Sequence, residues 1–172
     1  MKKFILIPLL GFLLISCSSM PKCDDSSILG LVSNILKKVA VLNFYKNECV
    51  SKKDFLLPAL SLSVMSSGSS IITLDTIKKL TEINQNDNQT NMYKCFKDKL
   101  DNLNFEYKDI VIEQLNKDTK TVICSASVKI SDNRKYMETK IKYKAYKTTD
   151  GKLGVAVDPE SLKDFTLDFI IF

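Results

Sequence analysis

Apolar and polar positions alternate with a period of two along the second half of the chain. The clearest run is Val122, Cys124, Ala126, Val128 and Ile130, whose intervening positions are Ile123, Ser125, Ser127 and Lys129. Successive side chains of a strand point to opposite faces of a sheet. This run therefore predicts a half-buried strand.

Three further strands are predicted around this one. Phe105 opens a run in which Ile110 and Ile112 lie two positions apart, and this run ends near Leu115. After the central strand, Met137, Thr139, Ile141, Tyr143 and Ala145 share one face of another strand. Asp150-Gly151 is a hairpin signal, and Leu153, Val155 and Val157 follow it. The four runs predict an antiparallel meander with one dry face and one wet face.

The region before the strands has helical periodicity. Apolar residues recur at helical spacing over residues 25–44: Ile28, Leu31, Val32, Ile35, Val39 and Leu42. Asp24-Asp25-Ser26-Ser27 supplies candidate N-caps. A helix of this kind either covers a sheet or lies on a membrane surface. Its polar face is not strongly cationic, which favours the first role. The predicted fold class is thus α+β, with one long amphipathic helix packed on a four-stranded antiparallel meander.

The segments outside these elements are less regular. Residues 50–70 form an irregular serine-rich insertion that reads as a loop rather than a hinge. The pattern leaves residues 73–84 open between helix and strand, and the polar stretch 84–91 predicts an exposed turn. A short helix is predicted from four apolar positions: Met92, Phe96, Leu100 and Leu103. After Pro159 we expect a short turn or helix, followed by an apolar tail on the sheet edge.

The first seventeen residues have the order of a secretory signal. Met1-Lys2-Lys3 is cationic, Phe4 to Ile15 is a continuous apolar run, and Ser16 and Cys17 follow. The apolar run is twelve residues long, whereas a bilayer-spanning helix needs about 20. A transmembrane segment is therefore not expected here.

The tetrapeptide Leu14-Ile15-Ser16-Cys17 resembles the lipobox of bacterial lipoproteins. The resemblance implies cleavage of a signal peptide at residues 1–16, a diacylglyceryl thioether on Cys17 and acylation of the new amino end. It implies a lipidated tether at 17–23 and a single periplasmic domain at 24–172. Ser18, in place of Asp, resembles an outer-membrane address. The implied location is the outer membrane, facing the periplasm, with the membrane contacted through the lipid.

Four cysteines remain: Cys23, Cys49, Cys95 and Cys124. An even number in an exported chain favours two disulfides, for which three connectivities exist. A helix over 25–44 is about 30 Å long and separates Cys23 from Cys49, whereas disulfide-bonded Cα atoms lie within about 7 Å. We favour Cys23–Cys124 with Cys49–Cys95. A zinc site is the alternative, but the cysteines lack zinc-knuckle spacing and histidine is absent, so no metal is expected.

Composition limits the chemistry further. The absence of histidine excludes hydrolases with an imidazole base, and the five glycines form no phosphate-binding loop. Two acidic pairs, Asp24/Asp25 and Asp98/Asp101, read as helix caps or surface charge. We therefore predict that the protein is not an enzyme and uses no cofactor. The formal charge of +5 becomes +3 without Lys2 and Lys3, which does not call for nucleic acid as a partner.

One surface is a candidate for binding anionic ligands. Four lysines are expected on the wet face of the sheet, with Tyr136 and Tyr146 at its ends: Lys129, Lys140, Lys142 and Lys144. Such a stripe suits a glycan, a lipid phosphate or an acidic protein. The alternative, which we favour, is a solvated lysine-rich face that limits aggregation between sheet edges.

The stretches Cys23 to Phe44 and Phe105 to Asp158 together resemble small exported bacterial domains of cystatin-like shape, in which a curved sheet wraps one helix. Residues 50–104 depart from that pattern. The resulting expectation is a non-enzymatic envelope protein that binds another envelope protein or peptidoglycan. The main alternative is an inhibitor or immunity module against a hydrolase or toxin. A carboxylate-based glycan hydrolase is a further alternative.

Overall fold

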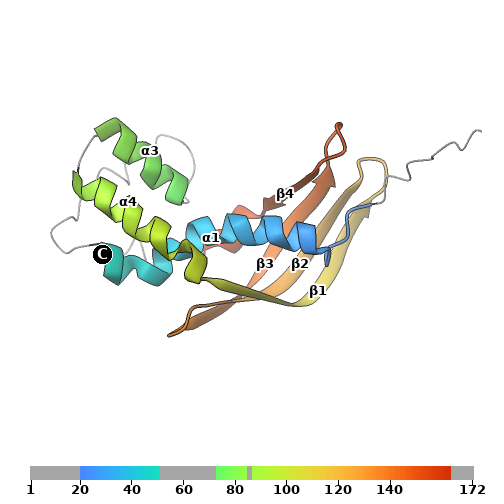
Figure 1. Ribbon diagram of the computed structural model, residues 1–172. Coiled ribbons are helices and arrows are strands. Elements are labelled where there is room, and N and C mark those ends of the chain that lie inside the picture. The colour runs from blue at the N-terminus through green and yellow to red at the C-terminus, as the bar shows by residue number, and fades with distance from the viewer. Residues whose placement is uncertain (1–19, 51–72, 85–86, 164–172) are drawn as a thin grey trace, which may run out of the picture.

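The computed structural model describes residues 20–50, 73–84 and 87–163. The helices are α1 (Ser26–Cys49), α3 (Leu74–Asn84), α4 (Asp87–Lys99), the 3-10 helix η1 (Leu100–Asn102) and α5 (Pro159–Lys163). The strands are β1 (Asn104–Asn116), β2 (Thr121–Ser131), β3 (Tyr136–Lys147) and β4 (Leu153–Val157). Helix α1 lies along one face of the sheet. Helices α3 and α4 lie together near the C-terminal end of α1 (Figure 1).

The sheet confirms the predicted meander. Its strand order is β1-β2-β3-β4, and each neighbouring pair is antiparallel. The five predicted inward residues of β2 are all at most 3% exposed: Val122, Cys124, Ala126, Val128 and Ile130. At the β3–β4 turn, Gly151 has a φ of 81°, a conformation that glycine adopts without steric cost.

Helix α1 covers this sheet, as its periodicity predicts. The Asp25 carboxylate accepts a hydrogen bond from the Ser27 backbone N–H at 2.8 Å and caps the first turn. The helix ends at Cys49, five residues beyond the predicted end, and Tyr45 interrupts it with φ −114° and ψ 15°. By length and composition α1 is apolar enough to span a membrane. Most of its apolar residues are instead buried in the core, whereas Leu29 and Ile35 are half-buried and Leu31 remains 36% exposed.

The segment between α1 and the sheet is helical. Residues 74–84 form α3, which resolves the ambiguity left by the sequence. The predicted turn over 84–91 is wrong from residue 87 onward, because α4 begins at Asp87. An aspartate in the first turn is favourable there, and fully buried Phe96 anchors α4 against the core. Packing thus outweighs the low helix propensity of the asparagine-rich start.

A single apolar core joins these layers. It includes residues of α1, the inner face of the sheet, α3 through Leu74 and Ile77, and α4 through Phe96. Leu162 of α5 closes it at 7% exposure, in the short helix expected after Pro159. The predicted serine-rich loop, apart from Val50, and the apolar tail lie outside the described residues.

Candidate functional site

The predicted cysteine pairs are both present. Cys23 bonds Cys124 with Cα atoms 5.8 Å apart, and Cys49 bonds Cys95 with Cα atoms 5.5 Å apart. Both distances are ordinary for disulfides. The favoured connectivity is confirmed. The predicted lipidation site, Cys17, lies outside the described residues.

The four predicted lysines share the outer face of the sheet. Three of them project from alternate positions of β3, and Lys129 projects from β2 beside them. The register places Ser125 opposite Lys142 and Ser127 opposite Lys140. Side chains in such cross-strand pairs are close neighbours. The sheet therefore brings together the lysines that the sequence groups.

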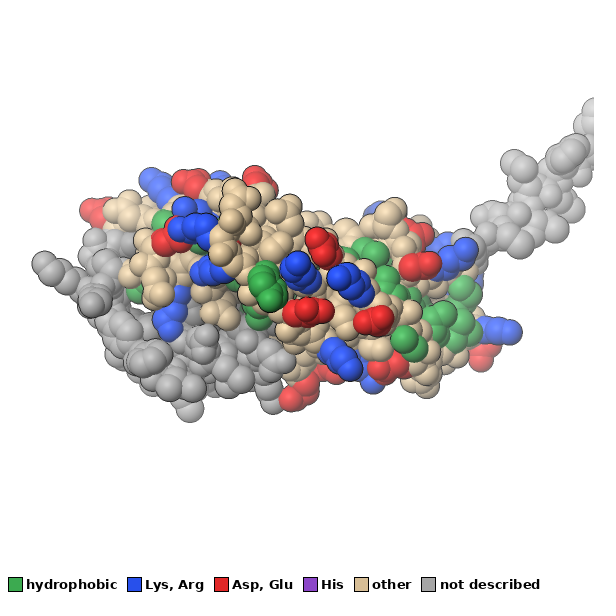
Figure 2. Space-filling model, turned by 90° about the horizontal axis from the view of Figure 1, so that it is seen from below, with side chains coloured by type: hydrophobic (Ala, Val, Ile, Leu, Met, Phe, Trp, Pro, Cys, Tyr) green, Lys and Arg blue, Asp and Glu red, His purple; other side chains and the backbone are tan. Residues whose placement is uncertain are grey.

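Carboxylates from β1 and β3 lie among these lysines. Glu113 of β1 forms an ion pair with Lys142 at 2.6 Å, and Glu106 and Glu138 are the register partners of Lys129 on either side. The hydrogen bond from Lys142 lowers the pKa of Glu113, so this carboxylate is charged at neutral pH. The face is thus a lattice of both charges rather than a stripe of one sign. Acidic and basic side chains also intermingle in the view of Figure 2.

Aromatic rings flank the charged lattice. The Lys129 ammonium lies 5.1 Å from the ring centroid of Tyr136, and the Lys144 ammonium lies 5.9 Å from that of Tyr146. Both are within the range of cation–π attraction. The ring of Tyr146 lies so close to Gly154 of β4 that a Cβ atom there would be 2.5 Å from it. The Tyr146 ring can therefore adopt this position only because residue 154 has no side chain.

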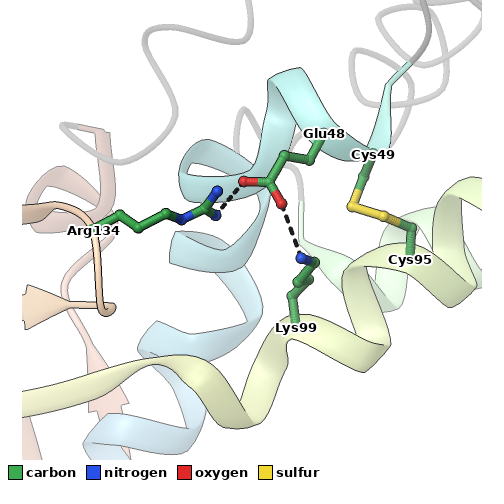
Figure 3. Close-up of a disulfide and its surroundings, with 5 residues drawn as sticks. All are labelled: Glu48, Cys49, Cys95, Lys99 and Arg134. Carbon is green, nitrogen blue, oxygen red and sulfur yellow. Dashed lines mark hydrogen bonds and ion pairs between the residues drawn. A yellow bond between two sulfur atoms is a disulfide. The ribbon is translucent and has the colours of Figure 1, made fainter.

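A second polar cluster, which the sequence did not reveal, joins the end of α1 to α4 and the β2–β3 turn. The Glu48 carboxylate accepts hydrogen bonds from Lys99, at 2.9 Å, and from Arg134. Figure 3 shows Glu48 between these two cations, beside the Cys49–Cys95 disulfide. The hydrogen bonds from Lys99 and Arg134 lower the pKa of Glu48. Three elements distant in sequence therefore meet at one carboxylate.

Asp132 supports this junction from the turn. Its Oδ1 accepts hydrogen bonds from the backbone N–H groups of Arg134 and Lys135, each at 2.8 Å, and its side chain is 4% exposed. Burial alone raises the pKa of Asp132. The two backbone donors and the Tyr45 hydroxyl more than offset that effect and lower it. Burial, followed by the bond to Asp132, raises the pKa of Tyr45 to about 12.

These protonation states define what the junction can do. The carboxylates are anionic and the Tyr45 phenol is neutral at pH 7, so each group is fixed in one charge state. A general acid or base works best with a pKa near the operating pH. The junction therefore has the character of a structural clamp. No local pattern in the sequence reveals this junction, because Glu48 is distant in sequence from Lys99 and Arg134.

Among residues 20–50, 73–84 and 87–163, no three His, Cys, Asp or Glu side chains are grouped to hold a metal ion. Comparison of the chain with protein-family models, with curated proteins and with solved structures finds no match.

Proposed function

We propose that this protein is a lipid-anchored, non-enzymatic component of a bacterial cell envelope, which binds another envelope protein or the wall through the outer face of its sheet. The observation that supports the lipid anchor is the way in which the cysteines pair. The two disulfides engage four of the five cysteines and leave Cys17, which directly follows Leu14-Ile15-Ser16.

The disulfides support an exported location independently of the signal. Disulfides persist in oxidising compartments such as the periplasm and are rare in the cytosol. Lipidation of Cys17 would account for the one cysteine outside the two disulfides. Several acyl chains hold a protein at a membrane almost permanently. Anchoring also explains why the domain itself needs no transmembrane segment.

The outer face of the sheet supports the binding half, because carboxylates placed in register with its lysines distinguish it from the purely lysine-rich solvated face that the sequence favoured. Lys129 has Glu106 and Glu138 as register partners, Lys142 pairs with Glu113, and aromatic rings lie at both ends, so the face offers donors and acceptors across β1, β2 and β3. A lattice of both signs is better suited to a complementary protein surface than to a uniformly anionic polymer, because electrostatic complementarity selects partners by register.

The anchor is tested by metabolic labelling with an alkyne analogue of palmitate in a bacterial host. We expect label on the wild-type protein and its loss in Cys17→Ala, with Cys49→Ser/Cys95→Ser as the control that removes two other cysteines, and with them one disulfide, but keeps the label. Equal labelling of wild type and Cys17→Ala would contradict the proposal, as would a mature protein whose Cys17 is found in an intermolecular disulfide.

The binding face is tested by co-purification from solubilised envelopes. The triple variant Lys140→Gln/Lys142→Gln/Lys144→Gln removes three cations from the lattice. Exposed charge contacts contribute about 0.5 kcal/mol each, which predicts roughly tenfold weaker partner binding. The matched control is Lys79→Gln/Lys94→Gln/Lys97→Gln on α3 and α4, which makes the same change in charge. Equal recovery of the partner by both triple variants would contradict this assignment.

A further inference from the structure

The distal half of β1 exposes three large apolar side chains. Val111 is 53% exposed, Ile112 is 55% exposed and Leu115 is 45% exposed. From Val111 to its end at Asn116, every residue of β1 is exposed, whereas alternate residues of β2 are buried along the whole strand. We call Val111, Ile112 and Leu115 the distal apolar group. Apolar side chains gather at the end of the molecule away from α3 and α4 (Figure 2).

The topology explains why this group is uncovered. β1 is an edge strand, and the backbone of α1 comes closest to β4, at the opposite edge of the sheet. The first part of β1 contacts the helix, where the Tyr107 and Ser33 hydroxyls are hydrogen-bonded at 2.8 Å, and side chains up to Ile110 pack against the core. The distal apolar group therefore lies beyond the cover that the helix provides.

The group occupies both faces of its strand. Val111 pairs with Ser125 on the outer face, whereas Ile112 pairs with Cys124 and Leu115 with Val122 on the inner face. Register shifts between Lys108 and Val111 and between Ile112 and Gln114 interrupt the ladder. Bulges twist a strand edge away from pairing with another chain. A flat contact with a second copy would cover only one face of this strand and would need a regular edge. Insertion into a lipid layer can cover the apolar side chains on both faces.

The group also lies beside the point where the N-terminal segment joins the domain. Ile112 is the register partner of Cys124, and Cys124 is bonded to Cys23 with Cα atoms 5.8 Å apart. Pro21 is already buried in the domain. Four residue steps separate Cys17 from Pro21, a span of at most about 14 Å. A lipid on Cys17 would thus hold the distal apolar group close to the bilayer.

We propose that Val111, Ile112 and Leu115 form a membrane-contact surface that inserts into the interfacial layer of the phospholipid bilayer carrying the anchor. The inference rests on the lipid anchor of the proposed function. Lys117 and Lys120 lie in the turn that follows β1, and the Lys147 backbone N–H bonds the Lys120 carbonyl at 3.4 Å. Cations next to an apolar edge favour approach to anionic headgroups. The domain is thereby held in one orientation, with α3 and α4 away from the membrane.

The chain contains no tryptophan, which allows a site-specific reporter. Ile112→Trp and, separately, Leu115→Trp are introduced into the full lipidated protein, which is then reconstituted into phosphatidylcholine–phosphatidylglycerol vesicles. Tyr136→Trp is the matched control, because Tyr136 is 68% exposed and belongs to the hairpin at the other end of β2. Brominated lipids quench tryptophans that lie in the bilayer.

We expect blue-shifted emission and at least about twofold quenching by brominated lipids for Ile112→Trp and Leu115→Trp, and no quenching for Tyr136→Trp. Equal quenching of all three reporters, or none, in protein that floats with the vesicles would overturn the membrane-contact surface and leave the anchor intact. A blue shift that depends on protein concentration and ignores bromine would instead identify a second copy as the occupant and would also overturn it. Failure of the wild-type protein to float would count against the anchor itself.

Discussion

Asp132 illustrates how one carboxylate can organise a junction between elements. It accepts two backbone hydrogen bonds within its own turn and one from the Tyr45 hydroxyl, which belongs to α1. Tyr45 is 1% exposed, so its hydroxyl has little access to water as a substitute partner. Leaving a buried polar group without its partner costs about 1–3 kcal/mol.

We therefore expect Asp132→Ala to lower the free energy of unfolding by about 1–3 kcal/mol, measured by urea denaturation. Asp132→Asn keeps an acceptor oxygen for the turn and should lose less. Asp118→Ala, at an exposed position in the β1–β2 turn, is the control and should change stability by no more than about 0.5 kcal/mol. Similar midpoints for Asp132→Ala and Asp118→Ala would show that the clamp contributes nothing.

At the scale of elements, the two disulfides differ in accessibility. Cys23 and Cys124 are 3% and 0% exposed, whereas Cys49 and Cys95 are only partly buried. The second bridge lies beside the Glu48 ion pairs at the surface junction of α1 and α4 (Figure 3). Access of the attacking thiolate to the sulfur atoms governs the rate of thiol–disulfide exchange.

Limiting dithiothreitol should accordingly open Cys49–Cys95 before Cys23–Cys124. Alkylation followed by peptide mass spectrometry will report which thiols appear first, and we expect modified Cys49 and Cys95 at times when Cys124 is still bonded. Simultaneous modification of all four cysteines would mean that opening of the whole fold, rather than local access, limits reduction.

The elements also differ in how well the sequence predicts them. The strands are predicted because alternation is local and the dry face of β2 is continuous from Val122 to Ile130. Helix α4 was missed at its start because its asparagine-rich first turn is polar. Its stability comes from Phe96 in the core and from the bridge to Cys49, which are contacts distant in sequence.

The residues of the candidate site also differ in how far local sequence patterns predict them. The grouping of Lys140, Lys142 and Lys144 follows from the period of one strand. Glu113, which forms the ion pair with Lys142, belongs to another strand, and its position depends on a register shift in β1 that no local pattern encodes. The Glu48 junction was invisible for the same reason, since it joins three separate elements.

For the whole molecule, the shifted groups predict a wide pH range of constant stability. Glu48, Glu113, Asp132 and Asp150 have lowered pKa values in the folded protein. Their contribution is present above their ordinary pKa near 4 and is lost as the pH falls through the lowered values. Burial raises the pKa of Tyr45 and Tyr143 to about 12. Their contribution is full below about pH 10 and is lost as the pH rises toward 12.

With no histidine in the chain, nothing among its side chains is expected to add a step between these limits. Thermal unfolding followed by circular dichroism should give a nearly constant midpoint from about pH 5 to pH 9, with a fall on either side. A clear step between pH 6 and pH 8 would show that an ionisable group with a strongly altered pKa controls the fold.

The Cys23–Cys124 bridge has a mechanical consequence. Any tension applied to the residues before Cys23 passes through sulfur into β2, a central strand held by neighbours on both sides. The load then acts on two ladders of hydrogen bonds together, instead of peeling α1 from its first turn. The domain should therefore withstand a pull on its N-terminal segment far better than a domain whose N-terminal segment ended in a helix without such a bridge.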